Sequence, residues 1–131
     1  MNGVIIVTLP QAVSVEDARR GLNMFRELKI PVMGVVENMS YLELPDGQKM
    51  EVFGSGGGEA LAKEAGVHFM GSIPMDPAVR EGGDGGKPIV IAKPDSPAAN
   101  AICRIAYDAA LKASVAAVKE KSRTIPIQMV N

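Results

Sequence analysis

The chain has 131 residues, enough for one small domain with a single core. Its 14 Lys and Arg against 15 Asp and Glu give a net charge of −1, which argues against a general polyanion binder, so no nucleic-acid partner is expected. With one cysteine, one histidine, no apolar run near the ~20 residues of a membrane span and no secretory signal, we expect no disulfide framework, no membrane partner and a cytoplasmic location.

The first third of the chain predicts a strand, a helix and a second strand. Residues 4–7 and 32–36 are short β-branched runs, typical of strands buried on both faces of a parallel sheet. Ser14 with Asp17 three residues later indicates a capping box at the start of a helix that Pro31 ends. An apolar stripe at helical spacing should pack this helix on the sheet: Val15, Ala18, Leu22, Phe25 and Leu28.

The middle of the chain predicts a hairpin, a helix and a third strand. Residues 41–53 suit a small hairpin with its turn at Asp46-Gly47. The glycine-rich residues 54–58 then lead into a helix over 59–65, which Gly66 ends, and residues 67–73 form the next strand.

The last third predicts two helices separated by an edge strand. Asp76-Pro77 is a typical N-cap and first helical position, for a helix to about residue 81. Residues 88–92 are expected to form a fourth strand, and Ser96-Pro97 to start a long helix from 98 to about 117. Residues 119–131 suit an edge strand or a tail that docks elsewhere. The fold class is therefore α/β, with a mainly parallel sheet flanked by helices.

Ligands of such sheets bind beyond the carboxyl ends of the strands, here residues 8–11, 37–40 and 73–76. Glu37 and Asp76 lie at two of these ends and could act as an acid–base pair. The preferred interpretation is structural, with Asp76 as an N-cap and Glu37 as a strand-end residue.

Two glycine-containing segments are candidate phosphate sites. Residues 54–58 precede a helix, whose free N–H groups favour an anion, but they depart from G-x-G-x-x-G because the last position is Glu59. A flexible hinge is the preferred interpretation. Gly86-Lys87 is followed by Pro88 instead of Ser or Thr, so no phosphate-binding loop of the G-x-x-x-x-G-K-[ST] type is expected there.

Three further features have structural interpretations by default. His68 is expected in a strand, within the core or on its surface, and Cys103 is expected as a buried structural thiol in the long helix. The alternative for Cys103 is a metal or cluster ligand shared with its copy in a second chain. The basic residues near the C-terminus suit a solvated helix end: Lys112, Lys119, Lys121 and Arg123.

Several segments resemble, in order, the Mrp family of MinD/ParA-like P-loop ATPases, which carry and deliver iron–sulfur clusters. They are residues 6–11, 17–21, 35–41 with its Glu-Asn-Met-Ser-Tyr run, 53–58, 71–76 and 82–88. The resemblance covers about residues 3–110. It implies a partial nucleotide-binding domain over residues 1–118, followed by a tail over residues 119–131.

The resemblance implies only the C-terminal half of that domain, because family members carry a deviant Walker A loop and switch segments that would precede this chain. ATP and Mg²⁺ are therefore implied for the full-length family, while the chain alone is expected not to hydrolyse ATP. Many members place a Cys-x-x-Cys pair where residues 42–47 contain no cysteine, so no iron–sulfur cluster is expected at that place.

The resemblance also implies an adenine-side wall made by Asn38, Pro74 and Asp76. An Asn amide offers both a donor and an acceptor to the base, a Pro ring offers a flat apolar wall, and the helix start at Asp76 shapes the ribose side. A homodimer, for which this chain supplies the dimer surface with its hairpin facing the second copy, and iron–sulfur client or scaffold proteins are the implied partners. The alternatives are a non-enzymatic homodimerisation or interaction module derived from this family, and a cleaved or engineered piece of a longer protein.

Overall fold

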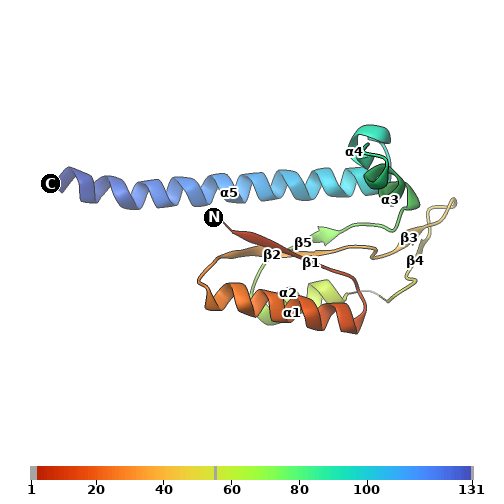
Figure 1. Cartoon of the computed structure of the whole chain (residues 1–131), viewed down its shortest axis with the longest axis horizontal. Coiled ribbons are helices and arrows are strands. Elements are labelled where there is room, and N and C mark those ends of the chain that lie inside the picture. Colours follow the sequence, from red (N-terminus) through yellow and green to blue (C-terminus); the bar gives the residue numbers. More distant parts are fainter. Residues whose placement is uncertain (1–2, 55, 131) are drawn as a thin grey trace.

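The computed structural model describes residues 3–54 and 56–130, with side chains described as far as Lys119 (Figure 1). The elements, in chain order, are β1 (Val4–Thr8), α1 (Ala12–Glu27), β2 (Val32–Glu37), β3 (Leu42–Glu43), β4 (Lys49–Met50), α2 (Gly57–Ala65), β5 (Phe69–Ser72), α3 (Pro77–Asp84), α4 (Ile89–Ala92) and α5 (Pro97–Val130).

The centre of the molecule is a parallel sheet with the strand order β1-β2-β5. Helices α1 and α2 cover one face, and α5 lies across the other (Figure 1). The β3–β4 hairpin, α3 and α4 gather at the carboxyl end of the strands (Figure 1). The predicted α/β class, the parallel sheet and the hairpin are confirmed.

The hydrophobic core lies between the sheet and the pair α1 and α2. Leu22 of α1 and Leu61 of α2 are each only 1% exposed, and they pack with buried residues of β1 and β2. The predicted stripe of α1 is confirmed for Val15, Ala18, Leu22 and Phe25. It is wrong for Leu28, which is exposed because α1 has already ended at Glu27.

Strand β1 is buried on one face only, contrary to the prediction. Ile6 and Thr8 point to the α1 and α2 side and are buried, whereas Ile5 is 36% and Val7 59% exposed. Side chains alternate along a strand, so the two outward residues share the opposite face. On that face α5 packs against β5, which is two strands away from β1.

The start of α1 also differs from the prediction. The helix begins at Ala12, and its N-cap residue Gln11 makes no side-chain cap. Ser14 lies in the first turn of α1 and bonds back to the preceding segment. Its hydroxyl accepts the Leu9 N–H at 3.0 Å and lies 3.2 Å from Thr8 Oγ1. The serine therefore fastens the end of β1 to α1 instead of forming a capping box with Asp17.

The predicted edge strand over residues 88–92 is wrong, because this segment forms the helical turn α4. The Pro88 carbonyl accepts the N–H groups of Ile91 and Ala92, both at 2.9 Å. Ile89 is buried beside the start of α5. A four-residue apolar run is ambiguous between strand and helix, and here the local turn after Pro88 decides.

Helix α5 starts as predicted and runs further than predicted. The Ser96 hydroxyl accepts the Ala99 N–H at 3.1 Å as an N-cap. The backbone stays helical to Val130, so residues 119–130 form no edge strand. The packing of side chains 120–131 lies outside the described residues, and the docking alternative for the tail stays a prediction.

Candidate functional site at the carboxyl end of the sheet

Backbone hydrogen bonds hold the carboxyl ends of the three parallel strands together. The Asn38 N–H donates to the Thr8 carbonyl at 2.7 Å, and the Ile73 N–H donates to the Glu37 carbonyl at 2.8 Å. The Ser40 N–H returns a bond to the Ile73 carbonyl at 3.0 Å. The loops after β1, β2 and β5 therefore form one connected edge, as the sequence predicts for a ligand-binding end of a parallel sheet.

Glu37 is a buried carboxylate at this edge, only 1% exposed. Its Oε1 accepts the N–H of Gly58 at 2.9 Å, and its Oε2 accepts the Ser40 hydroxyl. Asp76 uses its own carboxylate to cap α3, accepting the Ala78 N–H at 2.9 Å. The predicted N-cap role of Asp76 is confirmed. Both carboxylates accept hydrogen bonds from nearby groups of the fold, which supports the structural interpretation over an acid–base pair.

The last two glycines of the glycine-rich segment are the first residues of α2 and are closely packed, whereas a Cβ on Gly54 or Gly56 would meet nothing within 4 Å. A Cβ on Gly57 would lie 2.8 Å from the Pro10 carbonyl oxygen, and one on Gly58 would lie 3.0 Å from the Cβ of Glu37. The Glu37 carboxylate already occupies the first turn of α2, where a helix N-terminus favours an anion. At these two positions glycine is needed for packing; Ser55 lies outside the described residues.

Pro74 and Asp76 line one pocket, and Asn38 lies on the neighbouring loop after β2, which is hydrogen-bonded to the loop after β5. Pro74 is buried, and its pocket with Asp76 measures about 260 Å³ and is closed by the start of α5. Asn38 is half-buried on the loop after β2, and its Oδ1 accepts the Met39 N–H at 2.9 Å. Asn38 does not belong to the described lining of the Pro74–Asp76 pocket.

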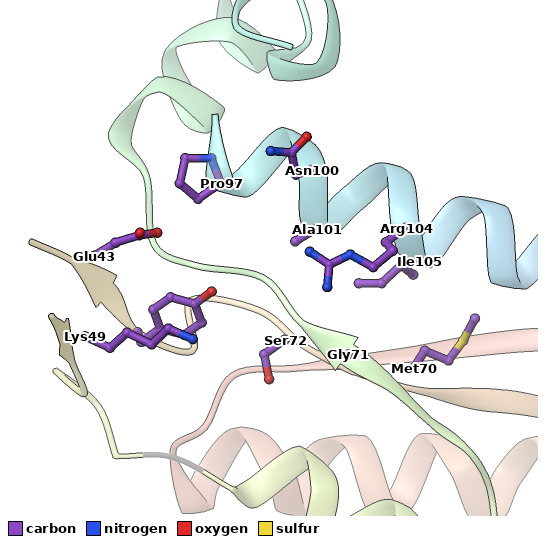
Figure 2. Close-up of a pocket in the computed structure, with 11 residues that line it drawn as sticks. Glu43, Lys49, Met70, Gly71, Ser72, Pro97, Asn100, Ala101, Arg104 and Ile105 are labelled. Carbon is purple, nitrogen blue, oxygen red and sulfur yellow. The ribbon is translucent and has the colours of Figure 1, made fainter. Parts of the chain in front are cut away.

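A second pocket, of about 360 Å³, lies between the hairpin, β5 and α5 (Figure 2). Polar side chains from four segments line it: Tyr41, Glu43, Lys49, Ser72, Asn100 and Arg104. The Nζ of Lys49 lies 4.6 Å from the ring centroid of Tyr41. Sequence reasoning missed this pocket, because no spacing along the chain relates a hairpin lysine to an arginine of α5.

Cys103 and His68 differ from their predicted surroundings. Cys103 is exposed, so the prediction of a buried thiol is wrong. The buried face of α5 carries Ala98 and Ala101, and a residue two positions after Ala101 lies about 200° around the helix. His68 lies before β5, and its Nε2 is 3.1 Å from the Asp108 carboxylate of α5.

Among the described side chains, which extend to Lys119, no group of three or more His, Cys, Asp and Glu residues is arranged to hold a metal ion. Among the helices in the same described part of the chain, none combines the length and apolarity needed to span a bilayer.

Solved structures identify the class of fold. The septum site-determining protein MinD of Pyrococcus horikoshii OT3, in complex with Mg-ADP, matches 88% of this chain and 44% of its own, with a TM-score of 0.65 and 23% identity. A nucleotide-binding protein of Archaeoglobus fulgidus in complex with ADP matches 73% of this chain and 39% of its own, with a TM-score of 0.56 and 31% identity. The chain has part of a MinD-like α/β fold.

The sequence comparisons identify the family. Residues 1–110 match the ParA family model described as NUBPL iron-transfer P-loop NTPase, and the chain belongs to this family. The iron–sulfur cluster carrier protein of Synechocystis sp. is 50% identical over 121 residues, which cover 90% of this chain and 34% of that protein. The chain thus spans about a third of the length of the curated relatives it matches.

Proposed function

We propose that this chain forms the adenine-side wall of the nucleotide site in an Mrp-type iron–sulfur cluster carrier ATPase. The observation that carries the proposal is the Pro74–Asp76 pocket at the joined carboxyl ends of the strands, in a chain of the NUBPL iron-transfer family. Ligands of open parallel sheets bind at this edge.

The residues at this edge fit a nucleoside. Pro74 presents an apolar ring and has no backbone N–H. Asp76 holds the N-terminus of α3 through Oδ1, which leaves its Oδ2 to accept from a ribose hydroxyl. The Asn38 amide nitrogen is a donor for a base, while its oxygen holds the Met39 N–H. In the proposed arrangement, the Asn38 amide contacts the edge of the base and the Pro74 ring contacts its face.

We expect this chain alone not to hydrolyse ATP. Phosphoryl transfer depends on backbone N–H groups, a lysine and Mg²⁺ around the phosphates. At the glycine-rich start of α2, the Gly58 N–H already donates to the Glu37 carboxylate and is therefore occupied. The chain's contribution is to bind and orient the nucleoside end of ATP. Other residues would bind the phosphates and Mg²⁺.

In the proposed function, the iron–sulfur cluster is cargo that the carrier transfers. Thiolates hold such clusters, and Cys103 is the single cysteine of the chain and lies exposed on α5. We therefore expect no cluster absorbance after anaerobic reconstitution of this chain. Cluster absorbance that Cys103→Ser abolishes would contradict this expectation and indicate a site shared between two copies.

Adenosine binding tests the proposed wall, because adenosine carries no phosphate. We expect the ¹⁵N-labelled chain to bind adenosine weakly, with shifts confined to the loops after β2 and β5. Asn38→Ala should weaken binding about 5- to 10-fold, since one hydrogen bond is lost. Asn23→Ala on the exposed surface of α1 is the matched control and should change nothing.

Two outcomes would reject this proposal. One is an absence of adenosine shifts at millimolar concentration, and the other is equal weakening by Asn38→Ala and Asn23→Ala. ATP turnover above background by the purified chain would separately contradict its inactivity.

A second candidate function is a homodimerisation module, favoured by the outward face of β1. This edge strand exposes Ile5 and Val7 and carries no charged residue. Uncharged apolar edge strands pair readily with other strands. The two functions are compatible, and only the second requires an intact β1 edge.

A further inference from the structure

The 360 Å³ pocket between the hairpin, β5 and α5 carries two cations without acidic partners (Figure 2). Lys49 comes from β4 and Arg104 from α5. Within the described part of the chain, neither forms an ion pair with a carboxylate. Among the described lining residues, two cations face one carboxylate, that of Glu43, so the local charge is positive.

The two cations are held by different elements around the same space. Lys49 is the strand partner of Glu43 in the hairpin, and its ammonium lies over the Tyr41 ring, 4.6 Å from the centroid. Such a cation–π contact fixes a lysine that would otherwise sample many rotamers. Arg104 extends from α5 into the space above β5 (Figure 2). Both cations therefore border the same space.

Neutral polar groups complete the lining. Ser72, at the end of β5, contributes a hydroxyl, whereas Asn100 borders the pocket from the first turns of α5 with its amide directed away from β5, 3.5 Å from the Asp95 carbonyl. Met70 and Ile105 provide apolar wall, and Figure 2 shows them at the far end of the pocket from the hairpin. Arg104 lies beside Ile105 on α5, so a cation borders this apolar wall as well.

We propose that this pocket binds a small organic anion through Lys49 and Arg104, with a carboxylate or phosphate as the recognised group. A guanidinium forms paired hydrogen bonds with either group, and a lysine adds a point charge. The volume is within the range of small-molecule sites. This function is separate from the nucleoside wall, because the two pockets share only Glu43 and Pro97 among their described lining residues.

Titration of the full chain with inorganic pyrophosphate and, separately, with citrate tests the proposal. Isothermal titration calorimetry gives the affinity, and ¹⁵N shifts report the site. We expect at least one probe to bind, with shifts at β4, the end of β5 and the first turns of α5. The probe that binds distinguishes a phosphate from a carboxylate ligand.

Matched charge removals on one helix identify the site. Arg104→Gln should weaken binding at least 10-fold, because a charge-assisted hydrogen bond pair is lost. Lys112→Gln, two turns further along α5 and outside this pocket, should change the affinity less than twofold. Lys49→Gln provides a second test from the hairpin side and should also weaken binding.

Failure of this proposal is distinguishable from failure of the nucleoside wall. Adenosine binding should respond to Asn38→Ala and not to Arg104→Gln, while anion binding should show the reverse. The anion site is rejected if neither probe binds at millimolar concentration. It is also rejected if Lys112→Gln weakens binding as much as Arg104→Gln, which would indicate nonspecific attraction to cations.

Discussion

Glu37 joins three parts of the molecule through one buried side chain. It ends β2, receives the hydroxyl of Ser40 in the following loop and receives the N–H of Gly58 in the first turn of α2. A buried donor that loses its acceptor costs more than an average hydrogen bond contributes, because it has also lost water. The position of α2 against the sheet should therefore depend on this carboxylate.

Replacing Glu37 should reveal that dependence. Glu37→Ala leaves the Gly58 N–H and the Ser40 hydroxyl without their acceptor and opens a cavity, for an expected loss of about 3 kcal/mol in unfolding free energy. Glu37→Gln should cost less, since an amide accepts from Gly58 and donates to the Ser40 oxygen. Urea unfolding followed by far-ultraviolet circular dichroism measures both.

The control for this prediction is Glu64→Ala. Glu64 pairs with Arg19 on the surface, where an ion pair contributes about 0–1 kcal/mol. A loss at Glu37 no larger than the loss at Glu64 would show that the buried network does not fix α2.

At the scale of the elements, the same glycine substitution should have opposite effects in two helices. A Cβ on Gly58 would meet the Glu37 Cβ at 3.0 Å and Thr8 Cγ2 at 3.3 Å, whereas a Cβ on Gly21 in α1 would meet nothing within 4 Å. Alanine is favoured over glycine inside a helix by about 0.5–1 kcal/mol. Only the free position should show that gain.

We therefore expect Gly21→Ala to stabilise the chain by about 0.5–1 kcal/mol, and Gly58→Ala to destabilise it by about 1–2 kcal/mol. Thermal and urea unfolding of the two variants against the parent chain provide the measurement. Equal stabilisation by both would mean that the joint between α2 and the sheet is loose enough to accept a methyl group.

An element is predicted correctly when its sequence signal depends only on neighbouring residues. Asp76 as an N-cap and Gly66 as a C-cap depend on neighbouring residues alone, and both predictions are confirmed. Ser14 carries the same N-cap signal, but its hydroxyl bonds to Leu9 and Thr8, which precede the helix. The strand predicted after Pro88 is wrong, because a run of four apolar residues fits the spacing of a buried strand and that of a helix equally well.

In the candidate sites, contacts between residues far apart in the sequence were likewise not predictable from local patterns. The carboxyl ends of the strands were predictable, because a parallel sheet places them at one edge whatever the loops do. The partnership of Glu37 with Gly58 was not, since it crosses 21 positions and depends on how closely α2 approaches β2. The pocket of Lys49 and Arg104 depends on where α5 crosses β5, which no local pattern encodes.

On the scale of the whole molecule, apolar surface is distributed unevenly. One face of the sheet is sealed by α1 and α2, while the opposite face is exposed at Ile5 and Val7 of β1. Helix α5 adds a stripe at helical spacing whose side chains are half or more exposed: Tyr107, Leu111, Val115 and Val118. Contiguous exposed apolar surface of this kind marks an interaction face, and the net charge of −1 offers little repulsion between copies.

A second copy paired through β1 is the expected occupant of that edge. β1 is at the end of the strand order, and its sequence Val-Ile-Ile-Val-Thr has none of the charges or prolines that protect edge strands. Two copies related by a twofold axis would add their β1 strands to each other and bring the outward residues together. We therefore expect association that grows with protein concentration.

Val7→Lys should weaken this association, because Val7 is 59% exposed on the outward face and a lysine there opposes apolar contact and strand pairing. Sedimentation velocity over a concentration series should show a dimer dissociation constant at least 10-fold higher than that of the parent chain. Val13→Lys is the matched control, since Val13 is 77% exposed on α1, away from β1's outward face. If the parent chain stays monomeric throughout the series, or if both lysines act alike, the β1 edge does not mediate association. Adenosine binding that survives Val7→Lys would show that the nucleoside wall functions within a single copy.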